Sequence, residues 1–355
     1  MDKKTVVILT SHSNRGENKE WEPGDQQITE GVFRILPELN NHNIILIKTL
    51  EPEQQDEAIK NCDYVIVAGT PGWVHPSFRK NWKSCEKYGK HISFLGIGLA
   101  VPYEADFWYG REDFTHFKDS GLIDLVVCRD KYALYWIKKR VGFDGSRIAS
   151  LPCPAFYMMD KAPVKEKKKV VFSIANIAEC SISSFDAYKD YYNNSKDLVK
   201  DLKKIGAEVF ITYMRSIPNH AEFMVEMKEL FPEDTITGFN SPQEFRDFHT
   251  DKDIYIGVRN HGALPMSGAG KPSLLLGTDY RQKLAEEIPF LSKIDISYSG
   301  INQREVMDWY HSLSPEGISR SLIDYRNISY KRYRTLLKPL IELLKIEEVS
   351  GEKNG

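Results

Sequence analysis

An arginine and a histidine two residues apart form the strongest chemical signal in the sequence. Arg259 and His261 directly follow the apolar run 253–258, with Asn260 and Gly262 beside them. A guanidinium fork binds carboxylate or phosphate, and an imidazole titrates near neutral pH, so it suits acid–base catalysis. A lone histidine is more often a packed or surface residue, and the neighbouring arginine is what favours a functional site here.

A second arginine stands in the same kind of position. Arg129 follows the apolar run 125–128 and precedes Asp130 and a helical stretch. Ligands of open parallel sheets bind beyond the carboxyl ends of the strands, at helix N-termini. The alternative is an Arg129–Asp130 surface ion pair, and the position after a buried strand argues against it.

Glycines and an aromatic residue follow the earlier apolar runs. Gly24 and Asp25 open a helix after the polar loop 11–23, and Asp25 is suited to cap it. Gly69 ends the third run, and Trp73 offers a stacking face for a sugar ring. A capped helix and a tight turn explain these residues equally well, but the length of the loop favours a substrate loop.

Several classes of protein are disfavoured by what the sequence lacks. It has no complete dinucleotide fingerprint, no G-x-S-x-G elbow, no P-loop and no metal-ligand spacing, so we expect no protein-bound metal. The 48 basic and 50 acidic residues give a net charge of −2, which does not favour nucleic acid. Without a long apolar run or a signal peptide, the five scattered cysteines predict a cytoplasmic protein with reduced thiols.

The elements that must position these residues alternate along the chain. Short β-branched runs that are apolar throughout predict strands buried on both faces of a parallel sheet. Between them, apolar residues at helical spacing predict amphipathic helices, so the first half is a doubly wound α/β domain. The expected strands are 6–10, 44–48, 64–68, 92–96 and 125–128, and the expected helices are 26–39 and 130–141.

The charged, proline-containing stretch 162–169 predicts a linker, after which the alternation starts again. We therefore expect an N-terminal Rossmann-like domain over 1–160 and a second over 168–325, with an amphipathic helix over 328–348 returning to the first. In the second half, the expected strands are 170–174, 208–213, 235–238, 253–258 and 272–277, with helices 197–205 and 221–231.

These segments, in this order, resemble the polysaccharide pyruvyl transferase family over roughly residues 6–277. The most specific matches are the Arg129-Asp130 pair and the segment 259–263, followed by Gly270-Lys271-Pro272. The other matches are Gly24-Asp25, 63–69, 96–98 and 152–156. The sequence departs from the family pattern at Thr70-Pro71, at Cys153 and at Asn260, where an apolar residue is usual.

The resemblance implies a fold similar to GT-B glycosyltransferases, in which two Rossmann-like domains face each other across a cleft. It also implies transfer of an enolpyruvyl unit from phosphoenolpyruvate to two hydroxyls of a sugar, which forms a cyclic pyruvate ketal and releases phosphate. No cofactor is implied beyond the co-substrate. The acceptor would be a sugar or a lipid-linked oligosaccharide, and the enzyme a cytoplasmic protein, peripheral at the membrane and homo-oligomeric.

Roles for individual residues follow from this framework. His261 would carry protons, and Arg129 and Arg259 would meet it from opposite domains around the doubly anionic donor. Because aromatic faces suit sugar rings, the acceptor side would lie on the N-terminal domain. The expected catalytic residues are His261 and Arg129, the donor-binding residues Arg259, Asn260, Gly262 and Lys271, and the acceptor-binding residues Gly24, Asp25, Gly69, Trp73 and His75.

Two other functions fit the same residues. A GT-B glycosyltransferase would use Arg259 and His261 to bind the diphosphate of a nucleotide sugar. A catalytically silent, glycan-binding family member would account for the departures at Thr70-Pro71 and Asn260.

Overall fold

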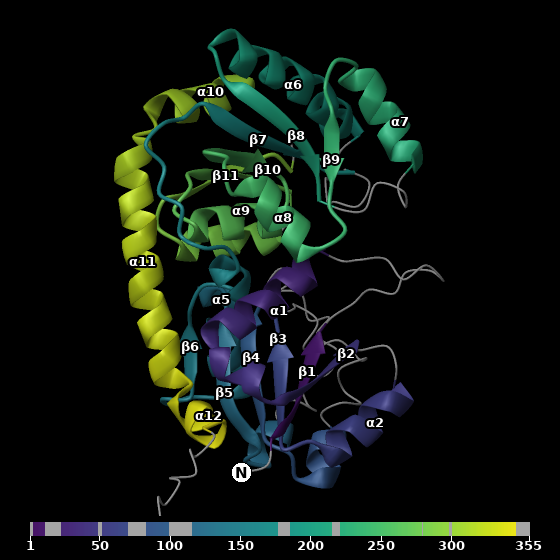
Figure 1. Cartoon of the computed structure of the whole chain (residues 1–355), viewed down its shortest axis with the longest axis vertical. Coiled ribbons are helices and arrows are strands. Elements are labelled where there is room, and N and C mark those ends of the chain that lie inside the picture. The colour runs from purple at the N-terminus through teal and green to yellow at the C-terminus, as the bar shows by residue number, and fades with distance from the viewer. Residues whose placement is uncertain are drawn as a thin grey trace, which may run out of the picture.

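The computed structural model describes residues 3–10, 23–48, 52–69, 83–98, 116–176, 185–214, 221–278, 280–297 and 300–345. Two lobes stack along the long axis of the molecule (Figure 1), and each lobe is built on one six-stranded sheet. Every described strand pair is parallel, for example β1 with β3 and β7 with β10. The α/β class expected from the apolar runs is therefore confirmed in both halves of the chain.

The first sheet has the strand order β2-β1-β3-β4-β5-β6, which reverses between β1 and β3. The apolar runs bury both faces, since most strand residues are inaccessible to solvent. The strands are β1 (Thr5–Thr10), β2 (Asn43–Lys48), β3 (Tyr64–Ala68), β4 (Ile92–Ile97), β5 (Ile123–Cys128) and β6 (Ile148–Ser150). The helices include α1 (Pro23–Ile35), α2 (Pro52–Asn61) and α5 (Lys131–Trp136), which continues as a π-helical turn, Ile137–Val141.

The second sheet has the order β12-β11-β10-β7-β8-β9. In domain numbering this is 6-5-4-1-2-3, the order of dinucleotide-binding domains, with its reversal between β7 and β10. The strands are β7 (Lys169–Ile174), β8 (Glu208–Tyr213), β9 (Ile236–Gly238), β10 (Ile254–Gly257), β11 (Ser273–Gly277) and β12 (Leu291–Asp295). The helices are α6 (Phe185–Lys204), α7 (Ala221–Leu230), α8 (Pro242–His249), α9 (Asn260–Gly268) and the 3-10 helix η7 (Tyr280–Glu287).

Some elements differ from the sequence prediction. The edge strands β6 and β12 were not predicted, because β6 has only three residues and β12 is partly exposed along its length. The helix predicted over 26–39 ends at Ile35 and is followed by a 3-10 helix, Pro37–Asn41. Pro37 explains this end, since proline disfavours α-helical backbone in the residue before it.

Two glycines let the lobes pack on a shared junction. The short 3-10 helix η4 (Pro154–Tyr157) is buried between α1 of the first lobe and α9 of the second. A Cβ atom on Gly31 of α1 would lie 1.9 Å from the Pro154 carbonyl oxygen, and one on Gly268 of α9 would lie 1.6 Å from that of Phe156. One hydrophobic core therefore runs continuously through the junction and both lobes.

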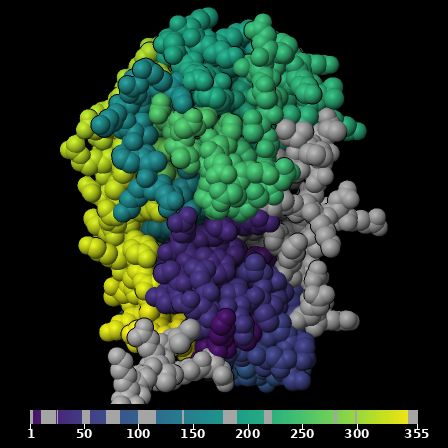
Figure 2. Space-filling model, in the orientation of Figure 1, coloured from purple at the N-terminus to yellow at the C-terminus, as the bar shows by residue number. Residues whose placement is uncertain are grey.

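The C-terminal helices connect the lobes along one side. After α10 (Gln303–Ser312), helix α11 (Pro315–Leu336) runs past both lobes, in yellow in Figures 1 and 2. Arg334 forms an ion pair with Glu38 of the first lobe and donates to the Ile35 carbonyl at 3.0 Å. The last helix, α12 (Lys338–Leu343), buries Leu340 and Ile341 in the shared core, so the C-terminal segment is packed on the first lobe.

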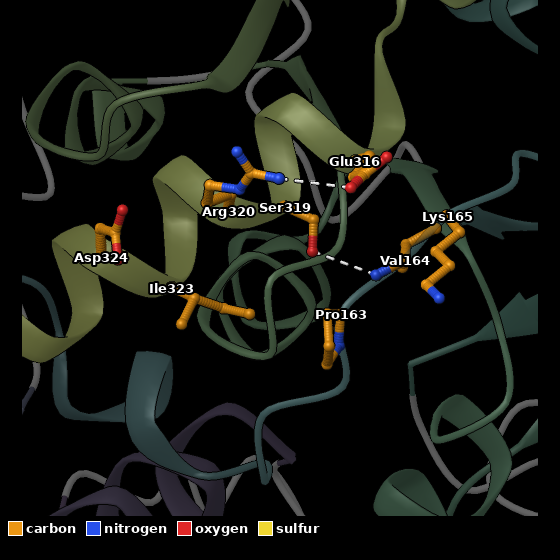
Figure 3. A pocket seen from close by; sticks show the side chains of 8 residues that line it. All are labelled: Pro163, Val164, Lys165, Glu316, Ser319, Arg320, Ile323 and Asp324. Atoms are coloured by element: carbon orange, nitrogen blue, oxygen red, sulfur yellow. Dashed lines mark hydrogen bonds and ion pairs between the residues drawn. The ribbon is translucent and has the colours of Figure 1, made fainter.

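A pocket of about 210 Å³ lies where the linker passes α11 (Figure 3). The Val164 amide donates to the Ser319 hydroxyl at 3.0 Å across it, and none of the residues with predicted functions lines it. Among the helices that the structure describes, none is long and apolar enough to cross a membrane.

Candidate active site between the lobes

His261 lies at the point of the second sheet where ligands of this fold class bind. The strand order reverses between β7 and β10, and the chain leaves β10 through Arg259, the N-cap of α9. His261 is the second residue of α9. The segment thus combines a helix N-terminus, whose dipole favours anions, with a guanidinium and an imidazole.

The first lobe reaches this histidine through the start of α1. A Cβ atom on Gly24 would lie 2.5 Å from Nδ1 of His261, closer than real side chains allow. The imidazole therefore fills the space that a side chain at position 24 would need. Gly24, which was expected on the acceptor side, brings the two lobes together at the candidate site.

Arg129 approaches from the end of β5 in the first lobe. Its side chain is only 3% exposed, and a Cβ atom on Gly98, just beyond β4, would lie 2.3 Å from its Nε atom. Gly98 thus provides the space that the guanidinium occupies. Asp130 caps α5 by accepting a hydrogen bond from the Ala133 amide at 2.7 Å. Because Asp130 is buried as well, the alternative of an exposed Arg129–Asp130 pair is wrong.

Three arginines influence the imidazole. Burial lowers the pKa of His261 to about 3, and the positive charges of Arg129, Arg281 and Arg259 add to this effect. His261 is thus neutral at pH 7. Its Nε2 atom is shielded from solvent, and no described residue is its hydrogen-bond partner. The charges of guanidinium groups from both lobes therefore act on a neutral imidazole.

Arg281 was not predicted from the sequence. It lies in η7, four residues beyond the end of β11. The signal that could have found it is its place after the carboxyl end of a buried strand, where Arg129 and Arg259 were found. It does not follow the strand directly and has no histidine beside it, so the sequence pattern did not identify it as a site residue.

Both arginine-bearing segments are joined by contacts between the lobes. The Lys131 amide, two residues after Arg129, donates to the Glu287 carboxylate of η7 at 2.9 Å. Glu286 pairs with the Lys131 ammonium at 3.1 Å and accepts from the Tyr132 hydroxyl at 3.0 Å. Burial opposes ionisation of Glu286, but hydrogen bonds from Lys283, Lys131, Tyr132 and Lys293 outweigh it and lower its pKa to about 2.

The other predicted residues fall into two groups. In the first group, which the structure describes, Asn260 starts α9 and is half-buried. Gly262 and Gly69 allow close packing. A Cβ atom on Gly262 would lie 2.0 Å from the Tyr255 hydroxyl, and Gly69 has a φ of +73° and packs against Ile28. Trp73, His75, Thr70-Pro71, the loop 11–22 and the side chains of Pro23 and Asp25 lie outside the described residues.

The contacts of Lys271 do not agree with the donor-binding role expected for it. Its ammonium donates to the carbonyl oxygens of His249, Thr250 and Lys252 at 2.7, 2.7 and 2.6 Å. These three bonds use all its donors at the C-terminal end of α8, where a cation also complements the helix dipole. Lys271 is therefore a buried helix cap rather than a ligand for a donor phosphate.

No described group of three or more His, Cys, Asp or Glu side chains is arranged to hold a metal ion. The site is instead a cationic one, since the charges of Arg129, Arg259 and Arg281 all act on His261. Such an arrangement can bind a small polyanion in a fixed orientation and can exchange a proton with it.

Comparisons with known proteins agree with this architecture. A family model described as polysaccharide pyruvyl transferase matches residues 23–280, which include Arg129, Arg259 and His261. A search of the curated proteins finds no match. The resemblance inferred from the sequence motifs is thus confirmed by the family match.

Solved structures show the same fold at low identity. The MnaA protein of S. aureus, solved with UDP, has a TM-score of 0.60 and 11% identity, and the match covers 97% of this chain and 98% of that one. The UDP-GlcNAc 2-epimerase of Neisseria meningitidis, bound to UDP-GlcNAc, has a TM-score of 0.54 and 10% identity over 94% and 100%. The glycosyltransferase SnogD of Streptomyces nogalater has a TM-score of 0.51 and 10% identity over 97% and 100%. These matches confirm the GT-B-like fold.

Proposed function

Because the chain belongs to the polysaccharide pyruvyl transferase family, we propose that it moves an enolpyruvyl unit from phosphoenolpyruvate to a glycan sugar. The product is a pyruvate ketal on two hydroxyls, and phosphate is released. The observation that carries this proposal is the set of guanidinium groups around His261, with Arg129 in the first lobe and Arg259 and Arg281 in the second.

The donor matches the charge of this site. Phosphoenolpyruvate carries a carboxylate and a phosphate on a three-carbon frame, so its pocket needs several positive charges close together. Guanidinium groups bind both anions through paired hydrogen bonds, which also fix orientation. A site with one arginine contributed by the first lobe and two by the second would hold the donor across the boundary between them.

His261 is suited to the proton transfers of the reaction. A proton from solvent adds to C3 and leaves an oxocarbenium-like centre at C2, which a sugar hydroxyl attacks while losing its own proton. A second hydroxyl then displaces phosphate and closes the ketal. A neutral imidazole accepts a proton from a hydroxyl, and the bound anionic donor stabilises the imidazolium that forms, because opposite charge nearby raises the pKa of a histidine.

The proposal is tested by incubating the protein with phosphoenolpyruvate and a panel of glycosides and measuring phosphate release. We expect phosphate release that depends on one glycoside and falls by about 10²–10⁴-fold in His261→Asn. Arg259→Lys keeps the charge but loses the fork, so it should weaken donor binding. Near-normal turnover in His261→Asn would contradict the proton-carrier role.

A nucleotide-sugar glycosyltransferase is the second candidate. The second sheet has the strand order of dinucleotide-binding domains, and the MnaA structure was solved with UDP. A parallel screen with UDP-sugars decides between the two, since this activity releases UDP rather than phosphate. Glycan binding without consumption of either donor would instead identify a catalytically silent family member.

We also propose that the acceptor is a sugar of a glycan precursor, free or lipid-linked, and that the enzyme meets it in the cytoplasm at the membrane surface as a homo-oligomer. In this proposal the enzyme uses phosphoenolpyruvate as a co-substrate and needs no cofactor. Sedimentation of the protein with and without vesicles that carry a lipid-linked glycan tests both the membrane contact and the oligomeric state.

A further inference from the structure

We propose that Gln27 is an acceptor-binding residue, whose side-chain amide binds a sugar hydroxyl beside His261. This inference rests on the proposed function for the nature of the acceptor. It concerns a residue that neither the sequence motifs nor the arginine cluster identified.

The amide of Gln27 is buried and has no hydrogen-bond partner among the residues that the structure describes. Gln27 lies in the second turn of α1 and is 0% exposed. Neither its Nε2 nor its Oε1 atom has a hydrogen-bond partner in the part of the chain that the structure describes. Buried polar groups nearly always form hydrogen bonds, so an amide with both ends unsatisfied calls for an explanation. A bound ligand would supply both partners.

The position of Gln27 places this amide next to the candidate site. Gln27 follows Gly24 by three residues, so the two lie on the same face of α1, about 4.5 Å apart along its axis. Helical side chains lean toward the N-terminus of their helix, and Gly24 has no side chain in the way. Helix geometry therefore directs the Gln27 side chain toward the first turn of α1, where Gly24 meets His261.

The face of α1 that carries Gln27 is the one that meets the second lobe and the junction. Gly24 lies against His261 of α9, and Gly31 against the carbonyl of Pro154. Glu30, one residue before Gly31, forms an ion pair of 2.9 Å with Arg246 of α8. In Figure 1, α1 lies at the boundary of the two lobes, below α8 and α9. Gln27 is thus an interlobe residue.

The unsatisfied atoms indicate which ligand the amide binds. An amide both donates and accepts hydrogen bonds, as a sugar hydroxyl does. It carries no charge, and the anionic donor already has three guanidinium groups. The Nε2 atom of His261 is likewise buried and without a described partner. A hydroxyl between the two residues would accept from the Gln27 amide nitrogen and donate to His261.

This arrangement fits the attack of the first hydroxyl, which follows protonation of C3. Once the C2=C3 π electrons have formed a C–H bond at C3 and left C2 electron-deficient, the hydroxyl oxygen bonds to C2. Its O–H bond breaks, and the proton passes to Nε2 of the imidazole, which accepts it in the tautomer that carries hydrogen on Nδ1. The positive charge that His261 gains is offset by the bound donor. Gln27 would set the position of the attacking oxygen and thereby select the sugar.

The test compares Gln27→Met with a matched control, Gln55→Met. Gln55 is also a buried helical glutamine, 2% exposed. It lies on α2, at the end of the first lobe away from α9 (Figure 1). Binding of the methyl glycosides of galactose, glucose, mannose and N-acetylglucosamine is measured by saturation-transfer NMR, and binding of phosphoenolpyruvate by calorimetry.

We expect one glycoside to bind the wild-type protein and to bind Gln27→Met at least about tenfold more weakly, because a hydrogen bond to the ligand is lost. Phosphoenolpyruvate should bind this variant within about twofold of wild type. Its unliganded melting temperature should be equal or higher, since replacing a buried unsatisfied amide removes an unfavourable group. Gln55→Met should bind both ligands as the wild type does.

Unchanged glycoside affinity in Gln27→Met would overturn the inference, as would the absence of glycoside binding to the wild-type protein. A lower melting temperature with parallel loss of both ligands would show that Gln27 is structural. If a glycoside binds through Gln27 but no phosphate is released, the proposed function fails and the inference stands. If wild type and Gln27→Met release phosphate equally, the proposed function stands and the inference about Gln27 fails.

Discussion

Gly24 of the first lobe and His261 of the second lie so close that no side chain fits between them. A Cβ atom on Gly24 would lie 2.5 Å from Nδ1 of the imidazole and 3.0 Å from its Cε1 atom. The contact makes the start of α1 part of the wall that holds His261. It also means that the geometry of the candidate site depends on how the lobes are packed.

Replacing Gly24 by alanine should therefore displace the imidazole. We expect turnover to fall by about 10–100-fold, because small misplacements of a catalytic group are costly, while the melting temperature stays near that of the wild type. The measurement is phosphate release together with thermal unfolding. Gly317→Ala is the control. Gly317 lies in the first turn of α11, and a Cβ atom there would come no closer to a neighbour than 3.2 Å, to the Ser314 hydroxyl. Full activity in Gly24→Ala would show that His261 tolerates the shift.

Arg281 should contribute to donor binding although no sequence motif marks it. Removing its charge in Arg281→Ala should weaken phosphoenolpyruvate binding by about tenfold or more, the effect of losing a charge-assisted hydrogen bond. It should also raise the pKa of His261, because Arg281 is one of the cations that lower it. Calorimetry and imidazole NMR give the two readouts. Arg320→Ala changes a highly exposed arginine on α11 and serves as control; equal behaviour of the two variants would place Arg281 outside the donor site.

Binding of phosphoenolpyruvate should be coupled to proton uptake by His261. The pKa of the unliganded imidazole is lowered to about 3 by burial and by three arginines, and an anionic ligand should raise it. Where the complex binds more protons than the free protein, lower pH favours binding. Calorimetry in buffers of different ionisation enthalpy measures the uptake, and the difference between wild type and His261→Asn corrects for the donor's own protonation. An unliganded imidazole that titrates near 6.5 would contradict this prediction.

The contact between Glu287 and the Lys131 amide should hold the segment that carries Arg129 in a fixed position relative to the segment that carries Arg281. Glu287→Gln removes the negative charge from the side chain that accepts hydrogen bonds from the Lys131 backbone amide at 2.9 Å and from the Ser150 hydroxyl at 3.3 Å. We expect the KM for phosphoenolpyruvate to rise several-fold, with a smaller change in kcat, because the arginines bind the donor while the proton carrier is unaltered. Glu316→Gln, in an exposed pair with Arg320 at 3.3 Å, is the control. A change confined to kcat would argue against a role in donor binding.

Lys271 should be important for stability rather than for donor binding. Its replacement by methionine leaves three carbonyl oxygens without this donor, two of them in buried hydrogen bonds, and we expect the free energy of unfolding to fall by about 2–3 kcal/mol. Phosphoenolpyruvate should bind the folded variant with unchanged affinity. Chemical denaturation and calorimetry test the two parts. A selective loss of donor affinity at unchanged stability would restore the role expected from the sequence motif.

Much of the architecture could be predicted from the order of residues. Buried parallel strands must be apolar on both faces, so runs such as 64–68 and 92–96 identify themselves. β6 has only three residues and β12 is partly exposed along its length, which explains why these two strands were missed. Arg129 and the segment 259–263 were found for the same local reason: each directly follows a recognisable strand, and ligands bind at such ends.

What the residue order could not decide is how the two lobes meet. Gly24 and His261 are in contact although they are distant in the chain. Arg281 acts on His261, and Gln27 is buried, although neither residue belongs to a recognisable motif. Lys271 is the opposite case. The motif that contains it indicated an anion-binding residue, but its ammonium uses all three of its donors on carbonyl oxygens at the end of α8. Local pattern determines which elements form, because backbone and burial preferences act over a few residues. Only packing across the junction determines which side chains share a site and which of them are left without a partner.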